Sequence, residues 1–431
     1  MSMRREGSAW KALLGCAAGA FTAPSFALFC ELMSAWALTT ARRSIVGMVG
    51  VMDPATRGAH DAYHRLVRAG SWSLSALFCA LCKLVVARLA GDGRVVVYLD
   101  DTLFHRNGPK VDGAGSWRDA VRSTRKRVVF ARGLNLVVLC VRVTAPWGGM
   151  PIALPVNIRL HRKDGLTMPV LAREMMTELA VWLPEACFVL CADGAYATVA
   201  GDHLERTAVV SRMRRDAALY ELAPPRTGKR GRPRKRGARL PTPVKLARAA
   251  TGFTEVELDW RGRRVRKLLW SRDVLWYRVC PDALVRLVVV RDPLGHEPDD
   301  FFFTTDLGMS AAEVVEIYAG RWSIEVCYRD VKQGAGGQEP QSWKHHGPER
   351  AAGLSFWLYG AIWAWYIEIS GKRPSYTIQP WYPAKATPSF ADALAELRRT
   401  LWRERISPVS GVPTLDEQTV DVLVEALAVA A

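Results

Sequence analysis

Apolar positions in the first 90 residues recur at the spacing of α-helices. They follow a helical period over residues 26–40 and 72–89, and few turn signals interrupt them. The stretch Trp72-Ser73-Leu74 resembles a helix start, because serine is a preferred N-cap residue. We therefore predict a helical N-terminal region over residues 1–90, without a recognisable helix-turn-helix signature.

From Arg94 the pattern changes to short apolar runs that are typical of buried strands. Residues 94–101 (RVVVYLDD) and 187–193 (CFVLCAD) are such runs, and each ends in carboxylates. Further elements are expected as strands over 128–143, 150–160 and 207–213 and as a helix over 168–182. Strands first, then a helix, then strands alternating with helices is the order of a ribonuclease-H-like sheet. We predict an α/β fold of this class, with a mixed sheet and flanking helices.

The predicted sheet is interrupted by an insertion of different composition. Residues 226–239 (RTGKRGRPRKRGAR) hold eight basic and no acidic residues, which is typical of a solvated loop, and residues 252–305 read as β-rich. A helical pattern returns over 310–333, and two terminal helices are expected over 389–406 and 414–430. The expected divisions are 1–90 (helical, DNA-binding), 91–215 (first part of the core), 216–308 (insertion), 309–370 (second part of the core) and 371–431 (linker and helices).

Composition and charge narrow the class of protein. The formal net charge is +17 and the pI is about 9.7, so the surface attracts polyanions such as nucleic acid; an arginine-rich genome is the alternative source of this charge. The cysteines are odd in number and scattered in apolar runs, which suits a reducing compartment. Residues 12–30 are uncharged and resemble a signal peptide, but Pro24 interrupts the run and no clear small-residue cleavage site closes it. Residues 351–367 are also uncharged and resemble a membrane span, but a buried helix has the same pattern.

Three carboxylate positions carry the candidate chemistry. Asp100 and Asp101 are predicted to end one strand, Asp193 ends another, and Glu325 lies on a late helix. Adjacent central strands bring their ends together, so a carboxylate on a packed helix completes a hard-oxygen site for Mg²⁺. Two such ions suit phosphodiester cleavage and transfer. Each aspartate alone is equally compatible with a turn or a helix cap.

The helix that carries Glu325 also places other functional groups on one face. At 100° per residue, Tyr318, Arg321, Glu325 and Lys332 share a narrow face of a continuous helix. Arg and Lys grip phosphates, and a carboxylate beside them can ligate a metal. A solvated face with ion pairs explains the charges but neither the tyrosine nor the upstream aspartates.

The spacing Tyr-x2-Arg-x3-Glu-x6-Lys resembles the YREK signature of a group of bacterial insertion-sequence DDE transposases. Leu99-Asp-Asp-Thr102 is similar to the first-aspartate motif of this group, in which Thr follows the catalytic Asp, and Ala192-Asp193-Gly-Ala-Tyr is similar to the second. The resemblance covers residues 94–345. It implies that Asp101, Asp193 and Glu325 are the catalytic metal ligands for two Mg²⁺ ions, which Mn²⁺ can replace. It also implies that Tyr318, Arg321 and Lys332 hold the phosphate of the transposon end.

Two further features of the insertion suggest contacts with DNA. Arg230-Gly-Arg-Pro233 resembles an AT-hook core, so Arg230, Arg232, Arg234 and Arg236 are candidate DNA-binding residues, by minor-groove insertion or by phosphate attraction alone. The alternative is a solubilising loop without DNA contact. Three tryptophans of the insertion offer surfaces for a flipped base or, as is usual for Trp in a β-rich segment, belong to the core: Trp260, Trp270 and Trp276.

The resemblance implies a DNA transposase that cuts transposon ends and joins them to target DNA. The expected partners are DNA, as inverted-repeat ends and target, and a second copy of the chain within the DNA complex; no membrane partner is expected. The expected location is the cytoplasm, at the nucleoid. Alternatives are a catalytically silent DNA-binding protein with the same fold, a ribonuclease H or resolvase-type nuclease, and a membrane protein.

Overall fold

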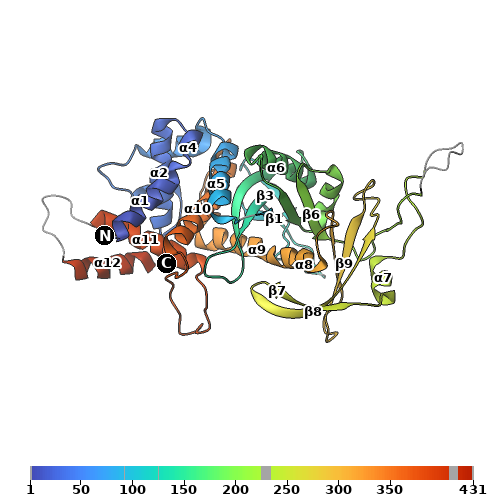
Figure 1. The fold of residues 1–431 in the computed structure, drawn as a ribbon. Helices are drawn as coiled ribbons and strands as arrows, with labels where there is room; N and C mark the ends of the chain where they lie inside the picture. Colours follow the sequence, from blue (N-terminus) through green and yellow to red (C-terminus); the bar gives the residue numbers. More distant parts are fainter. Residues whose placement is uncertain (1, 92, 125, 225–233, 407–415, 430–431) are drawn as a thin grey trace.

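The fold is built on one large mixed sheet with helices on both faces (Figure 1). The computed structural model describes residues 2–91, 93–124, 126–224, 234–406 and 416–429. The strands run in the order β2-β3-β1-β5-β6-β10-β9-β8-β7, and β4 pairs with β3. Their bounds are β1 Val95–His105, β2 Gly115–Arg118, β3 Phe130–Val143, β4 Ile152–His161, β5 Phe188–Ala192, β6 Thr207–Arg212, β7 Thr254–Trp260, β8 Arg263–Val274, β9 Val285–Arg291 and β10 Asp300–Thr304.

The first part of the sheet has the ribonuclease-H-like arrangement predicted from the sequence. Strand β1 pairs antiparallel with β3, and β3 pairs antiparallel with β4. On its other side β1 pairs parallel with β5, which pairs parallel with β6. Every residue of β5 is buried, because a central strand is covered on both faces. The mixed α/β fold class is therefore confirmed.

The strands of the predicted insertion extend this sheet and do not form a separate one. Strand β10 pairs antiparallel with β6 and with β9, and β8 and β7 follow outward. The outer strands and α7 (Pro243–Ala249) surround a smaller apolar core that contains Leu219, Leu287 and Phe303. The strands of the insertion and those of the first part of the core therefore share one backbone hydrogen-bond network.

Helices from both ends of the chain pack together beside the sheet, opposite the outer strands (Figure 1). The N-terminal group comprises α1 Ser2–Gly15, η1 Ala18–Ala20, α2 Ala23–Leu38, α3 Ile45–Gly50, α4 His60–Ala69 and α5 Leu74–Leu89. The C-terminal group comprises α10 Gly347–Ser370, α11 Phe390–Ile406 and α12 Glu417–Val429. Ser73 caps α5 as predicted, since its hydroxyl accepts a hydrogen bond from the Ala76 backbone N–H at 3.1 Å.

The uncharged stretch 351–367 lies in α10, and all its residues are buried among other helices and strands. Trp357 in this helix donates a hydrogen bond to the Leu77 carbonyl of α5 at 3.2 Å. Within the described ranges, no helix taken singly has the length and apolar character needed to cross a membrane. Only α4 and α5 taken together meet those criteria, with a 90° bend between them.

Candidate active site

The two neighbouring aspartates lie in the middle of β1. The prediction that they end the strand was wrong, because β1 continues to His105, which pairs with Gly133 of β3. In the sequence alone, two adjacent polar residues after an apolar run look like the end of a strand, because the pairing with β3 that continues the strand is not visible. Alternation along the strand sends the two side chains to opposite faces of the sheet.

Asp100 faces the helix that carries Glu325. Its carboxylate forms an ion pair with the Arg321 guanidinium, and its side chain is only 19% exposed. Burial, with the charges of Asp193 and Asp101, raises the pKa of Asp100 to about 7 against the opposing effect of Arg321. A carboxylate held in this way favours a nearby cation.

Asp101 faces the opposite side, towards α6 (Met168–Trp182) and η2 (Gly194–Asp202). Its carboxylate accepts a hydrogen bond from the Tyr196 hydroxyl at 3.4 Å. Burial and the charge of Asp193 raise the pKa of Asp101, while hydrogen bonds from Asn135 and Tyr196 lower it. Tyr196 was not predicted as a site residue, although it lies three positions after Asp193 in the Asp-Gly-Ala-Tyr motif.

Asp193 directly follows β5 and caps η2, where its carboxylate accepts a hydrogen bond from the Ala195 N–H at 2.8 Å. Its backbone carbonyl accepts a hydrogen bond from the Ser211 hydroxyl at 2.8 Å, which anchors the turn to β6. Because Leu99 pairs with Ala192 in the parallel register, Asp193 lies level with Asp100. The predicted convergence of these strands is therefore present.

The predicted helical region 310–333 is present, but its α-helical pattern is interrupted at Arg321 and it ends in a π-helical turn, so it is not one regular helix. A capping box at Ser310 and Glu313 starts α8 (Ala311–Gly320); α9 (Trp322–Arg329) and a π-helical turn, η3 (Asp330–Gly334), follow. A Cβ on Gly320 would lie 2.3 Å from the Tyr98 hydroxyl, so this glycine lets the α8–α9 junction approach β1. Periodicity alone does not reveal such a break.

Arg321 links the helix to the strand. It lies at the α8–α9 junction and bridges Asp100 to Glu325, whose carboxylate is 3.3 Å from the guanidinium. Burial lowers the pKa of Arg321, but Asp100 and other neighbours raise it overall, so the guanidinium stays charged. Its Nε atom is buried without a hydrogen-bond partner. The charge of Arg321 therefore offsets the repulsion between these carboxylates.

Tyr318 and Lys332 lie on either side of this bridge. The Tyr318 ring packs on Phe302 at 4.3 Å between centroids, and the Arg321 guanidinium lies 5.5 Å from it. Lys332 belongs to the π-helical turn, where its ammonium lies 5.9 Å from the Phe104 ring centre. Burial lowers the pKa of Lys332. Tyr318 and Arg321 thus form one group, and Lys332 lies further along β1.

The family of the chain follows from a comparison with known sequence families. The family described as DDE superfamily endonuclease matches residues 27–272, which is more than half of the chain. This chain belongs to that family. The matched region contains Asp100, Asp101 and Asp193 and ends before Glu325.

Two searches of known proteins complete the comparison. A search of the curated proteins found no match. Among solved structures, the chain is similar to the cryo-EM structure of a piggyBac transposase synaptic complex with hairpin DNA. That similarity has a TM-score of 0.41 and 11% sequence identity, and it covers 92% of this chain and 75% of that chain.

Endonucleases of the DDE superfamily use divalent metal ions, and the acidic residues here suit such ions. Asp100 and Asp101 have raised pKa values, as expected of crowded carboxylates without a cation. In the part of the chain that is described, the ligand atoms of Asp101, Asp193 and Glu325 do not all lie within 4.8 Å of one another. Two ions about 4 Å apart need carboxylates on both outer sides, so this wider spacing is compatible with a two-metal site.

The basic loop of this DDE endonuclease is described only in part. Arg230 and Arg232 lie outside the described residues. Arg234 and Arg236 are both exposed, and the Arg236 guanidinium lies over the rings of Tyr220 at 4.3 Å and Tyr277 at 5.1 Å. Arg236 therefore stacks on the protein, which limits its reach towards a partner.

The three tryptophans of the insertion pack against the protein interior. Trp276 is 4% exposed and packs edge-on against Phe303, with 5.2 Å between ring centroids. Trp260 and Trp270 are partly buried and pack against the large and the small apolar core, respectively. The structure thus favours the core alternative for these residues over a surface for a flipped base.

Proposed function

We propose that this DDE endonuclease is a DNA transposase that cuts transposon ends and joins them to target DNA. The observation that carries the proposal is the Arg321 bridge, which holds Glu325 beside Asp100 at the level of Asp193. Family membership supports a strand-cleaving activity on nucleic acid. The YREK spacing supports the narrower assignment to insertion-sequence transposases.

Two Mg²⁺ ions would be held by Asp193, Glu325 and one of the paired aspartates. The Thr102 motif pointed to Asp101 as that ligand. The geometry supports Asp100, because only this carboxylate faces Arg321 and Glu325. In this proposal Asp101, with its hydrogen bond from Tyr196, supports the position of Asp193 from the opposite face. When bound, the ions activate the attacking oxygen and stabilise the leaving oxygen.

The side chains around the carboxylates would orient the DNA. Arg321 offers a planar guanidinium group that can bind two phosphate oxygens. Tyr318 lies against this guanidinium and can donate a hydrogen bond from its hydroxyl. Lys332, which lies further along β1, would bind another phosphate of the DNA. These groups hold the cleaved end without ligating a metal.

The proposed partners are inverted-repeat DNA ends, target DNA and a second copy of the chain in the DNA complex. The proposed location is the cytoplasm, at the nucleoid, where this DNA lies. The test is incubation of the protein with Mg²⁺ and DNA that carries the inverted repeats flanking its gene. Nicked and joined products are expected; DNA binding without any cleavage in Mg²⁺ or Mn²⁺ would instead support a catalytically silent DNA-binding protein.

A further inference from the structure

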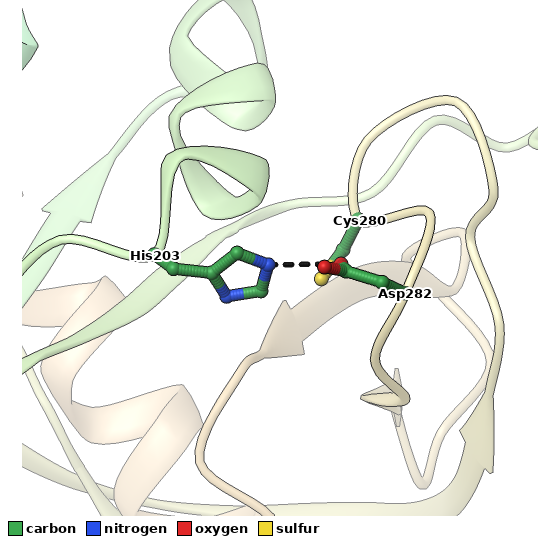
Figure 2. A group of neighbouring side chains, drawn as sticks. All are labelled: His203, Cys280 and Asp282. Atoms are coloured by element: carbon green, nitrogen blue, oxygen red, sulfur yellow. Dashed lines mark hydrogen bonds and ion pairs between the residues drawn. The ribbon is translucent and has the colours of Figure 1, made fainter.

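Three side chains with metal-binding atoms meet outside the acidic centre, which is the group Asp100, Asp101, Asp193 and Glu325 (Figure 2). His203 directly follows η2, and Cys280 and Asp282 lie in the connection between β8 and β9. His203 Nε2 lies 2.8 Å from Asp282 Oδ1, and the ligand atoms of all three residues lie within 4.8 Å of one another. Among the described residues, this is the one such group of His, Cys, Asp or Glu.

Backbone contacts hold the two segments together. A Cβ on Gly201 would lie 2.4 Å from the Val279 carbonyl oxygen, so only glycine allows this close approach. His203 has a left-handed backbone with φ of 45°, which is uncommon for a residue with a side chain and is found where the surroundings impose it. The Cys280 N–H donates to the Trp276 carbonyl at 2.9 Å, which fixes the turn. The cluster is therefore pre-formed and needs little rearrangement on binding an ion.

The chemistry of the donors selects the class of ion. One imidazole nitrogen, one thiol and one carboxylate are typical ligands of Zn²⁺ and do not suit Mg²⁺. Zinc bonds of about 2.0–2.3 Å in a tetrahedron place donor atoms roughly 3.3–3.8 Å apart, which small side-chain rotations reach from the present spacing. His203 and Asp282 are exposed, so water can fill the fourth position.

A hydrogen bond between His203 and Asp282 would by itself account for those two residues, and Cys280 by itself is a core residue of the smaller apolar cluster. A metal site requires that the ligand atoms of all three residues lie close together, as they do here. We propose that His203, Cys280 and Asp282 bind one Zn²⁺ ion, which ties the segment after Asp193 to the turn between β8 and β9. Binding breaks the S–H bond of Cys280 and releases its proton to solvent, and the imidazole binds through a neutral nitrogen. This proposal is independent of the proposed transposase activity.

The test uses Co²⁺ as a coloured substitute for Zn²⁺ on the metal-free full-length chain. We expect one tightly bound Co²⁺ per chain with a near-ultraviolet thiolate-to-cobalt band, which Zn²⁺ abolishes by displacement. Cys280→Ser should lose the band. His203→Gln and Asp282→Asn alter exposed side chains, so they should fold and weaken binding by at least about tenfold. Absence of the band in the wild-type chain would overturn the proposal.

Two controls separate this site from the rest of the molecule. Cys187→Ser removes an exposed thiol outside this cluster and should keep the band. Glu325→Gln alters the acidic centre and should also keep it. A band that survives in Cys280→Ser, or that disappears in Cys187→Ser, would show that another thiol binds the metal and would refute the assignment. Thermal unfolding of each metal-free variant, compared with the wild-type chain, verifies that it is folded.

Discussion

The acidic centre and the His203 cluster bring together side chains that lie far apart in the sequence, but they do so with different chemistry. At the acidic centre, Asp100, Asp193 and Glu325 are all carboxylates, and Arg321 offsets part of their charge. In the His203 cluster the donors are nitrogen, sulfur and oxygen, and His203 and Asp282 already share a hydrogen bond. At the acidic centre the excess of negative charge favours hard ions such as Mg²⁺. At the His203 cluster the chemical type of the ligand atoms selects the ion.

Among substitutions that test this comparison, those at the acidic centre should have the largest effect on activity. Asp193→Asn and Glu325→Gln keep the shape of each side chain but remove a charged metal ligand. We expect each to reduce strand cleavage on the order of 10³-fold while DNA binding is largely retained. A gel-based cleavage assay beside a binding assay measures both. Normal nicking by either variant would remove that residue from the catalytic set.

The next largest difference is expected between substitutions of Asp100 and Asp101, which point to opposite faces of β1. Asp100→Asn should lose cleavage as completely as Glu325→Gln, because Asp100 faces the same guanidinium. Asp101→Asn keeps a hydrogen-bond acceptor for Tyr196 and should lose only about tenfold, as is typical of a supporting residue. The two variants are compared on one substrate at equal metal concentration. The reverse ranking would show that the choice of Asp101 from the Thr102 motif is correct.

Arg321 is expected to affect the first cut, because it holds Glu325 beside Asp100, and also the later joining step, because it would bind the DNA end. Arg321→Ala removes a charge-assisted contact with the DNA end and should cost about 1.5–3 kcal/mol, or ten- to a hundredfold, in joining. Lys332→Ala is the comparison variant with a single point charge and should have a similar but smaller effect. Following nicked, double-cut and joined products over time separates the steps. If both variants lose the first nick as completely as Glu325→Gln, these residues belong to the chemical step.

The basic loop should contribute affinity without contributing chemistry. Replacing Arg230, Arg232, Arg234 and Arg236 with Ala should lower DNA affinity and flatten the dependence of log K on log salt, by about 0.9 for each phosphate that the loop no longer neutralises. Arg236→Ala alone should have the smallest effect, because this side chain stacks on Tyr220 and Tyr277. An unchanged slope in the fourfold variant would show that the loop does not touch DNA. A weakening confined to A·T-rich sites would indicate minor-groove insertion.

The smallest expected effect is on stability in the absence of metal. The folded chain keeps Asp100 protonated up to a pKa of about 7, whereas the unfolded chain ionises this group near pH 3.8. Unfolding between these values releases a proton, so the contribution of Asp100 to the free energy of unfolding falls as pH rises, by at most about 1.4 kcal/mol per pH unit. Urea unfolding with a chelator at several pH values should show a steeper fall for the wild-type chain than for Asp100→Asn. Equal slopes would contradict the raised pKa.

The sequence by itself determined most of the elements that carry the site. The apolar run before Asp193 predicted a buried central strand, since only a strand covered on both faces is apolar at every position. The order of strands and helices determined the fold class, because parallel strands need a helical crossover and short loops join antiparallel ones. The motif spacing brought Arg321 and Glu325 together, since residues four apart are neighbours on a helix.

Only the tertiary structure decided which face each aspartate of β1 takes and where the late helix breaks. Alternation along a strand states that Asp100 and Asp101 point apart, but the packing of α9 decides which one faces Glu325. The close approach of Gly320 to Tyr98 of β1, and the meeting of His203 with Cys280 where Gly201 lies against Val279, are tertiary contacts. Local propensity carries no information about such contacts, because the atoms involved are separated by tens to hundreds of residues and meet only when the sheet is assembled.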